Sequence, residues 1–210
     1  EPALPEVEDA AWCKSPLDRV VLATLEQREL RTAPPADKRT LLRRASYDLI
    51  GLPPTPEEIE AFLADESPGA FAQAVERLLD SPHYGERWGR HWLDVARYAD
   101  SNGLDENVAH GNAWRYRDYV LRAFNQDLPY DRFVKEHIAG DLLSPARLTP
   151  DGKQEETPVA TGLFGVGEER NGATDLAEVR AEKLDSRIDV FGKAFLGLTI
   201  ACARCHDHKF

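Results

Sequence analysis

The sequence predicts an all-α protein, an irregular multi-helix domain with long loops. Apolar residues recur every three or four positions in most segments, which is typical of helices that bury one face. Ser-Pro and Thr-Pro pairs mark several expected helix starts, because the hydroxyl caps the first turn and proline suits its first position. No segment alternates apolar and polar residues in the way that a half-buried strand would.

The first half of the chain divides into short helices joined by proline-containing links. Ser15 and Pro16 predict the first helix start, and residues 55–58 form a capping box that contains a proline. Gly51 ends the second helix, since glycine tolerates the left-handed conformation that closes many helices. The helices expected in this half cover residues 16–29, 37–50, 55–64, 68–80 and 83–99.

The second half predicts helices over residues 113–125 and 130–139, followed by a long loop over 140–157. The last and longest helix is expected from 175 to 201. Its inward face is expected to carry Leu176, Val179, Leu184, Ile188, Phe191, Phe195 and Leu198. Because the residues from Leu184 onward are spaced three or four apart, continuing this spacing places Cys202 and His206 on the buried face of the same helix.

The end of the chain carries the most informative motif, Cys202-Ala203-Arg204-Cys205-His206. Cys-x-x-Cys-His is the attachment pattern of c-type haem. Its two thiols bond to the haem vinyl groups, and the adjacent histidine ligates the iron from one face. We therefore expect covalent haem c held by Cys202 and Cys205, with His206 as the proximal iron ligand.

Three other interpretations of the motif remain open. The cysteines and a histidine could form part of a zinc site, although such a site usually has four ligands and the only other cysteine is the distant Cys13. A redox-active Cys-x-x-Cys is a second alternative, but it expects a strand before the motif. A pair of buried structural thiols is the third.

Composition limits the partners. The chain of 210 residues has a net charge of -11, which disfavours nucleic acid and anionic membrane surfaces and suits a basic redox partner. No apolar run is long enough to span a bilayer. Haem attachment to this motif takes place outside the cytoplasm, so we expect a periplasmic or otherwise exported protein whose start at Glu1 is a processed end.

The far side of the haem iron cannot carry a methionine, because the chain has none, so a histidine, another donor, water or no ligand is expected there. His91, between Trp88 and Trp92 on an aromatic helix, is the first candidate, and His83 is the second. An ordinary core or capping histidine is the simpler interpretation of both. His208 is a poor candidate, since its ring points away from the side that His206 uses.

Two polar clusters suggest other ligands. Residues 100–107 are rich in oxygen donors, but they lack the full spacing of a calcium loop, so a solvated turn is favoured over calcium. A second cluster could bind a polar substrate such as a sugar, although a buried ion-pair network between two helices is the favoured interpretation. Its members are Arg97, Asp100, Asp105, Trp114, Arg115 and Arg117.

Several long stretches carry a family resemblance. They are residues 15–21 (SPLDRVV), 48–58 (DLIGLPPTPEE), 81–101 (SPHYGERWGRHWLDVARYADS), 112–120 (NAWRYRDYV), 195–199 (FLGLT) and 202–210 (CARCHDHKF). With them the chain resembles the planctomycete cytochrome-associated domain of unknown function, from about residue 15 to the end. The resemblance implies an exported, multi-domain protein with c-type haem, whose chain continues past Phe210.

Together these observations predict an N-terminal extension, 1–14, and one helical domain, 15–210, with 15–80 and 81–210 as conceivable subdomains. The expected function is electron transfer by haem c within a larger redox protein, whose other domains would be its partners. Two alternatives are a haem-linked oxidoreductase that acts on a polar, saccharide-like substrate, and a zinc-binding interaction module.

Overall fold

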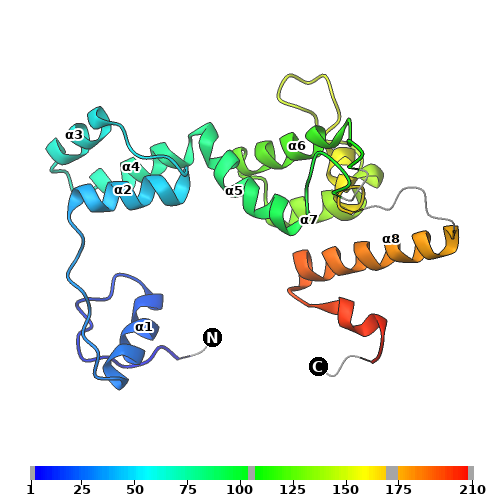
Figure 1. Cartoon of the computed structure of the whole chain (residues 1–210). Helices are drawn as coiled ribbons and strands as arrows, with labels where there is room; N and C mark the ends of the chain where they lie inside the picture. The colour runs from blue at the N-terminus through cyan, green and yellow to red at the C-terminus, as the bar shows by residue number, and fades with distance from the viewer. Residues whose placement is uncertain (1–2, 104–106, 169–174, 208–210) are drawn as a thin grey trace. The chain divides into compact units, whose positions relative to one another are not determined.

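Helices form the regular secondary structure of the chain (Figure 1). The computed structural model describes residues 3–103, 107–168 and 175–207. In these ranges the only β pairing consists of two isolated bridges, Ser101 with Ala109 and Leu148 with Glu155. The prediction of an all-α fold is therefore confirmed. No helix of the described part is long and apolar enough to cross a membrane.

The chain divides into two units, Glu1–Leu41 and Leu42–Phe210. The helices are α1 (Pro16–Gln27), α2 (Lys38–Leu49), α3 (Pro56–Ala64), α4 (Ala70–Leu79), α5 (Pro82–Val95), α6 (Ala113–Asn125), α7 (Tyr130–Ala139) and α8 (Leu176–Phe191). Shorter turns are η1 (Gly140–Leu142), η2 (Thr157–Phe164), η3 (Gly192–Leu196) and η4 (Ile200–Arg204). All the candidate site residues belong to the second unit.

Side-chain caps fix several helix starts as the sequence predicts. The side chains of Ser15 and Thr55 each accept a hydrogen bond from the N–H of the third helical residue, and their own backbone N–H groups donate to the carboxylate of that residue. Ser81 caps α5 by accepting from the N–H of His83 at 3.3 Å. The expected start at residue 68 is wrong by two residues, because Gly69 precedes α4 without a side-chain cap.

The main core forms where α5 and α6 approach each other closely. A Cβ on Gly85 would lie 2.4 Å from the carbonyl oxygen of Leu121, so only glycine allows this contact. The Gly85 N–H donates to Oδ1 of Asn125 at 2.7 Å. Around this contact α6, α7, η2 and α8 supply the buried cluster, whose members include Tyr116, Tyr119, Val120, Phe133, Leu163 and Val190.

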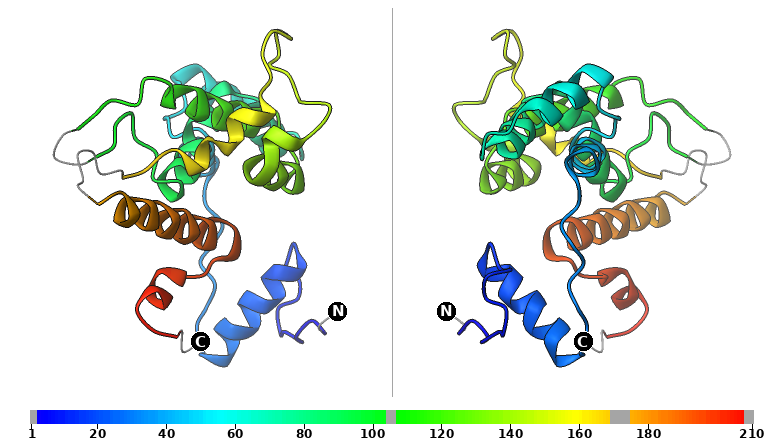
Figure 2. Two further views of the ribbon diagram at one scale, coloured as in Figure 1. Left: turned by 90° about the vertical axis from the view of Figure 1, so that its right-hand side faces the viewer. Right: turned by 90° about the vertical axis from the view of Figure 1, so that its left-hand side faces the viewer.

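The last helix is shorter than predicted. α8 ends at Phe191, a wider π-type turn follows over Gly192–Leu196, and Gly197 adopts a left-handed φ of 65°. The chain then turns back, so that η4 lies beside α8 (Figure 2). Glycine reaches this conformation without steric cost, which is why the helix ends here and does not run on to Ala201.

The expected buried face of that helix is wrong as well. Leu176, Leu184, Ile188 and Leu198 are each more than half exposed, whereas Val190, outside the predicted stripe, is 1% exposed. Phe195 packs on the core, but the left-handed residue at 197 changes the direction of the chain after it. The periodicity therefore does not continue through Cys202 to His206, and these residues are exposed.

The Gly85 contact yields a stability prediction. Gly85→Ala would force the α5 and α6 backbones apart, and we expect the free energy of unfolding to fall by about 1–3 kcal/mol. Gly69→Ala is the matched control, since the nearest atom to its Cβ would be Gln73 Nε2 at 3.6 Å. Urea unfolding of both variants measures the difference, and equal stability would contradict the close packing.

Candidate functional site

The haem-attachment motif occupies one short turn near the end of the described chain. Cys202 lies in η4, a 3₁₀ turn over Ile200–Arg204, and Cys205 follows directly after it. Residues three apart eclipse each other in a 3₁₀ turn. Both cysteines are free and exposed, so the turn offers two accessible thiols one turn apart, which is what two thioether bonds along one porphyrin edge require.

The histidine of the motif is exposed and has one nitrogen engaged. Nδ1 of His206 lies 2.8 Å from the carbonyl oxygen of Asp207. A histidine that binds metal commonly donates its second ring N–H to a carbonyl, which fixes the tautomer and leaves the other nitrogen as ligand. Among residues 3–103, 107–168 and 175–207, Nε2 of His206 has no hydrogen-bond partner, so the residues of the motif fit the haem group that the sequence predicts.

Short contacts hold the turn against α8. The Leu198 N–H donates to the Gly192 carbonyl at 3.0 Å, and Arg204 pairs with Asp185 at 2.7 Å. A Cβ on Gly192 would lie 2.7 Å from Cδ1 of Ile200 and 3.1 Å from the Leu198 carbonyl oxygen, so the returning chain packs closely against residue 192. The motif therefore lies in a returning segment, residues 192–206, which we call the hairpin. The left-handed Gly197 reverses its direction.

One aromatic side chain links this hairpin to the core. The Phe195 ring lies 5.6 Å from that of Trp92 and 6.1 Å from the imidazole of His137. Phe191 lies 5.2 Å from Phe195 on the other side. The position of η4, which carries Cys202, therefore depends on how Phe195 packs among these rings.

The two expected far-side ligands lie on α5. His83 is exposed and its Nδ1 is 2.7 Å from Glu86, while exposed His91 meets Trp88 edge-on at 5.4 Å. Within the described part of the chain, no hydrogen bond, ion pair or ring contact joins either histidine to the segment 200–207. Trp92, next to His91, contacts Phe195, so this end of α5 is joined to the hairpin through a neighbour.

The oxygen-rich loop folds on itself. Asn102 is 2% exposed, and its Oδ1 accepts from the Val108 N–H at 2.9 Å. Asp105 and its two neighbours lie outside the described residues. Across residues 3–103, 107–168 and 175–207, no three His, Cys, Asp or Glu side chains are arranged to hold a metal ion.

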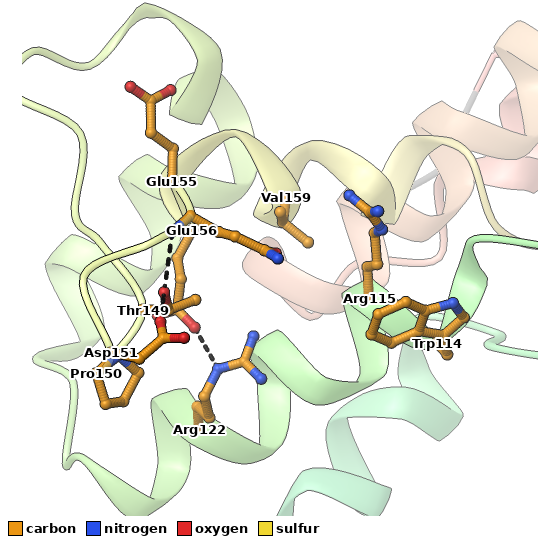
Figure 3. Close-up of a pocket in the computed structure, with 10 residues that line it drawn as sticks. Trp114, Arg115, Arg122, Thr149, Pro150, Asp151, Glu155, Glu156 and Val159 are labelled. Carbon is orange, nitrogen blue, oxygen red and sulfur yellow. Dashed lines mark hydrogen bonds and ion pairs between the residues drawn. The ribbon is translucent and has the colours of Figure 1, made fainter.

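The described residues of the expected polar cluster have different hydrogen-bond and ion-pair partners. Arg97 donates to Ser186 at 2.6 Å, Asp100 accepts from Tyr98, and Arg117 pairs with the adjacent Asp118. Trp114 and Arg115 line one cavity, together with residues of the loop before η2 (Figure 3). Asp100 also interacts electrostatically with Arg117, so these two members lie near each other. The cluster as a whole, whether as a substrate pocket or as an ion-pair network, stays a prediction, because Asp105 lies outside the described residues.

A buried hydrogen-bond chain was not predicted from the sequence. Trp92 Nε1–H donates to the Tyr116 hydroxyl at 2.8 Å, which lies 3.1 Å from Nε2 of His137. Nδ1 of His137 lies 2.8 Å from the Phe133 carbonyl. The imidazole is 0% exposed, and burial lowers its pKa to about 4, so it is neutral with both nitrogens satisfied.

A buried ion network lies next to this chain and was also missed. Glu136, 0% exposed, pairs with Arg132 at 2.9 Å and Arg147 at 3.0 Å, and Glu156, 1% exposed, pairs with Arg122 and Arg147. Burial raises the pKa of Glu136, but hydrogen bonds from the arginines outweigh burial and lower it. The loop that carries Arg147 and Glu156 is thereby fixed to α6 and α7.

The sequence held one usable signal for these groups. Arg132 and Glu136 stand four apart on a predicted helix, the spacing of a helical ion pair. Their partner Arg147 lies in the long loop, and no local pattern indicates that it returns to α7. Likewise Phe133 and His137 share one helix face, but only tertiary structure shows that this face is buried.

Comparison with known proteins gives one match. A family model described as "PSCyt2: Protein of unknown function (DUF1549)" matches residues 16–210. No curated protein matches the chain. No solved structure matches it either.

The buried imidazole makes stability depend on pH. Since the pKa of His137 is lowered to about 4 from 6.5, the unfolded chain binds a proton between these values that the folded chain excludes. The stabilisation that comes from excluding this proton is complete above pH 6.5 and is lost as the pH falls toward 4. We expect the free energy of unfolding to drop by on the order of 3 kcal/mol over this range.

Denaturant unfolding at a series of pH values measures the effect. His137→Gln should flatten the dependence between pH 6.5 and 4, although it lowers stability at neutral pH. His83→Gln, an exposed histidine on α5, is the control and should keep the slope. A variant at 137 that keeps the full slope would show that another group causes it.

Proposed function

Because the chain belongs to the PSCyt2 family of proteins of unknown function, its own residues must supply the argument, and we propose that it is a c-type haem-binding electron-transfer domain. The observation that carries the proposal is the turn at 202–206, where two free, exposed thiols stand one turn apart and His206 has Nδ1 engaged. A haem bound there would supply one-electron transfer, with a potential set by axial ligands and burial.

The surroundings of the turn support the proposal. Leu196 and Leu198 directly precede it, and Leu184 and Ile188 lie on α8, the helix beside which it folds; all four are more than half exposed. An apolar macrocycle attached at 202 and 205 would remove such surface from water. The exposure of these four side chains is therefore consistent with a protein whose apolar packing is completed when haem is attached.

The compartment and partners follow from the same proposal. Haem attachment to this motif places the protein outside the cytoplasm, as a periplasmic or otherwise exported domain. The net charge of -11 favours a basic redox partner, and other domains of the same polypeptide are further candidates, as the resemblance to cytochrome-associated domains implies.

Cysteine variants test the attachment. Protein exported together with a haem-attachment system should gain the mass of one haem and show a c-type absorption spectrum. Cys202→Ala with Cys205→Ala should abolish both, since no thioether can form. Cys13→Ala removes the remaining cysteine, which lies in the other unit, and should leave mass and spectrum unchanged.

Two results would contradict the haem proposal. One is exported protein that keeps bare thiols at 202 and 205. The other is stoichiometric zinc bound to those thiols with no iron, which would establish the zinc-binding interaction module instead. Intact mass and metal analysis of the same sample distinguish these results from haem attachment.

The far-side ligand is a separate prediction. We expect His91→Ala to shift the absorption spectrum of the haem-loaded protein toward that of iron with a single histidine, because the chain has no methionine to replace it. His83→Ala, whose ring nitrogen is held by Glu86, should shift it less. Unchanged spectra in both variants would mean that neither histidine is the far-side ligand.

A further inference from the structure

An aromatic cavity of about 520 Å³ lies where α5, α6 and α7 meet. The aromatic side chains that line it are Tyr84 and Trp92 of α5, Phe124 of α6, and Tyr130 and Phe133 of α7. Ala123, Leu128 and Pro129 supply the rest of its apolar lining. Among the described residues, none belongs both to this cavity and to the turn at 202–206. A ligand bound here would therefore be a second function, separate from haem.

The rings around the cavity lie at steep angles to one another. The Phe133 ring lies 4.8 Å from the Trp92 ring, with an angle of 76° between their planes. It lies 6.1 Å from the Phe124 ring at 69°. Rings that come from three helices at such angles can surround a ligand from several sides. This is the arrangement of the aromatic cages that bind quaternary ammonium ions.

One carboxylate lies at this cavity without a cation beside it. Asp127 is the one charged residue among the described residues that line the cavity. Across residues 3–103, 107–168 and 175–207, its carboxylate takes part in no hydrogen bond or ion pair. The face of an aromatic ring carries partial negative charge, so the rings and the carboxylate attract the same kind of ligand. In a chain of net charge -11, this lining favours a cation over a neutral molecule or an anion.

The backbone at Asp127 is consistent with a role for its side chain. Asp127 has a left-handed φ of 47° just after α6, where the Leu128 N–H donates to the Ala123 carbonyl at 2.9 Å. Glycine is the residue most favoured at this position of a helix end, because it adopts the left-handed conformation without steric cost. The helix end alone therefore does not account for an aspartate here, whereas a cationic ligand that pairs with the carboxylate does.

We propose that this cavity binds an organic cation that carries a methylated ammonium group, with its methyl groups against the aromatic rings and its charge beside Asp127. An unmethylated ammonium has three N–H donors that need acceptors, and the lining is mainly apolar. Methyl groups need no acceptor and add apolar surface to be buried. The volume lies within the range of about 300–1,000 Å³ for small-ligand sites, so it leaves room for a substituent on the nitrogen.

Calorimetric titration of the full chain with tetramethylammonium, choline and trimethyl-lysine tests the proposal. At least one should bind, and the uncharged tert-butyl analogue of choline should bind about tenfold more weakly than choline or worse, because it keeps the shape and loses the charge. Raising the salt concentration should weaken binding of the cations and leave that of the analogue unchanged, since only ionic contacts are screened.

Variants at the carboxylate separate binding from folding. Asp127→Asn should lower the affinity for the cations about threefold to tenfold, while asparagine still tolerates the left-handed backbone. Asp127→Gly should lose the same affinity without loss of stability in urea unfolding, because glycine adopts this backbone without strain. Asp131→Asn is the matched control, since Asp131 pairs with Lys135 on α7 and is not among the lining residues.

Variants at Tyr130 test the aromatic contact. The side chain is 63% exposed, so its replacement should leave the core intact. Tyr130→Phe keeps the ring face and should keep the affinity. Tyr130→Leu keeps apolar surface without a ring and should lower the affinity about threefold or more, the loss of one cation–π contact.

Three outcomes would overturn the proposal. The uncharged analogue binding as tightly as choline would reduce the cavity to a site for apolar ligands. Equal losses in the variants at 127 and 131 would show a general effect of surface charge. Failure of every methylated cation to bind, with circular dichroism showing the protein folded, would exclude the site. None of these outcomes touches the haem proposal, which depends on the thiols at 202 and 205.

Discussion

The neutral imidazole of His137 is the constraint on which the core depends. It connects α5, through Trp92 and the Tyr116 hydroxyl of α6, with the carbonyl of Phe133 in α7. Burying a polar group is tolerable only when its hydrogen bonds are made, and here each nitrogen has one partner. Phe195 packs on the same imidazole, so the hairpin that carries the cysteines depends on this chain as well.

The buried ion network has a different part in the architecture. Arg147 pairs with both buried carboxylates, Glu136 and Glu156. These ion pairs fix an irregular loop, which contains proline and glycine, to two helices. Removal of one member would leave an uncompensated buried charge, a costly change. The same network orients the partly exposed side chain of Arg122, so one set of ion pairs both orders the loop and positions a group that faces solvent.

Local patterns sufficed for most of the fold. Helix α6 and α7 occupy the ranges expected from periodicity, and the caps at Ser15 and Thr55 act within four residues. The errors arise where tertiary structure decides. The spacing of apolar residues predicted a buried stripe along α8. The core instead covers the face of α8 that carries Val190, and Leu184 stays exposed. Arg147 is distant in sequence from Glu136, so no spacing rule could connect them.

The most informative error concerns the end of the chain. A continuous helix would have placed Cys202 and His206 against the core, where two reactive thiols are difficult to reach. Gly197 instead turns the chain back onto Gly192, and both thiols are exposed on a single turn. Covalent attachment requires that a large planar group reach two sulfurs at once. The left-handed residue that breaks the predicted helix therefore makes the segment accessible to the modification that its sequence predicts, while Phe195 keeps it attached to the core.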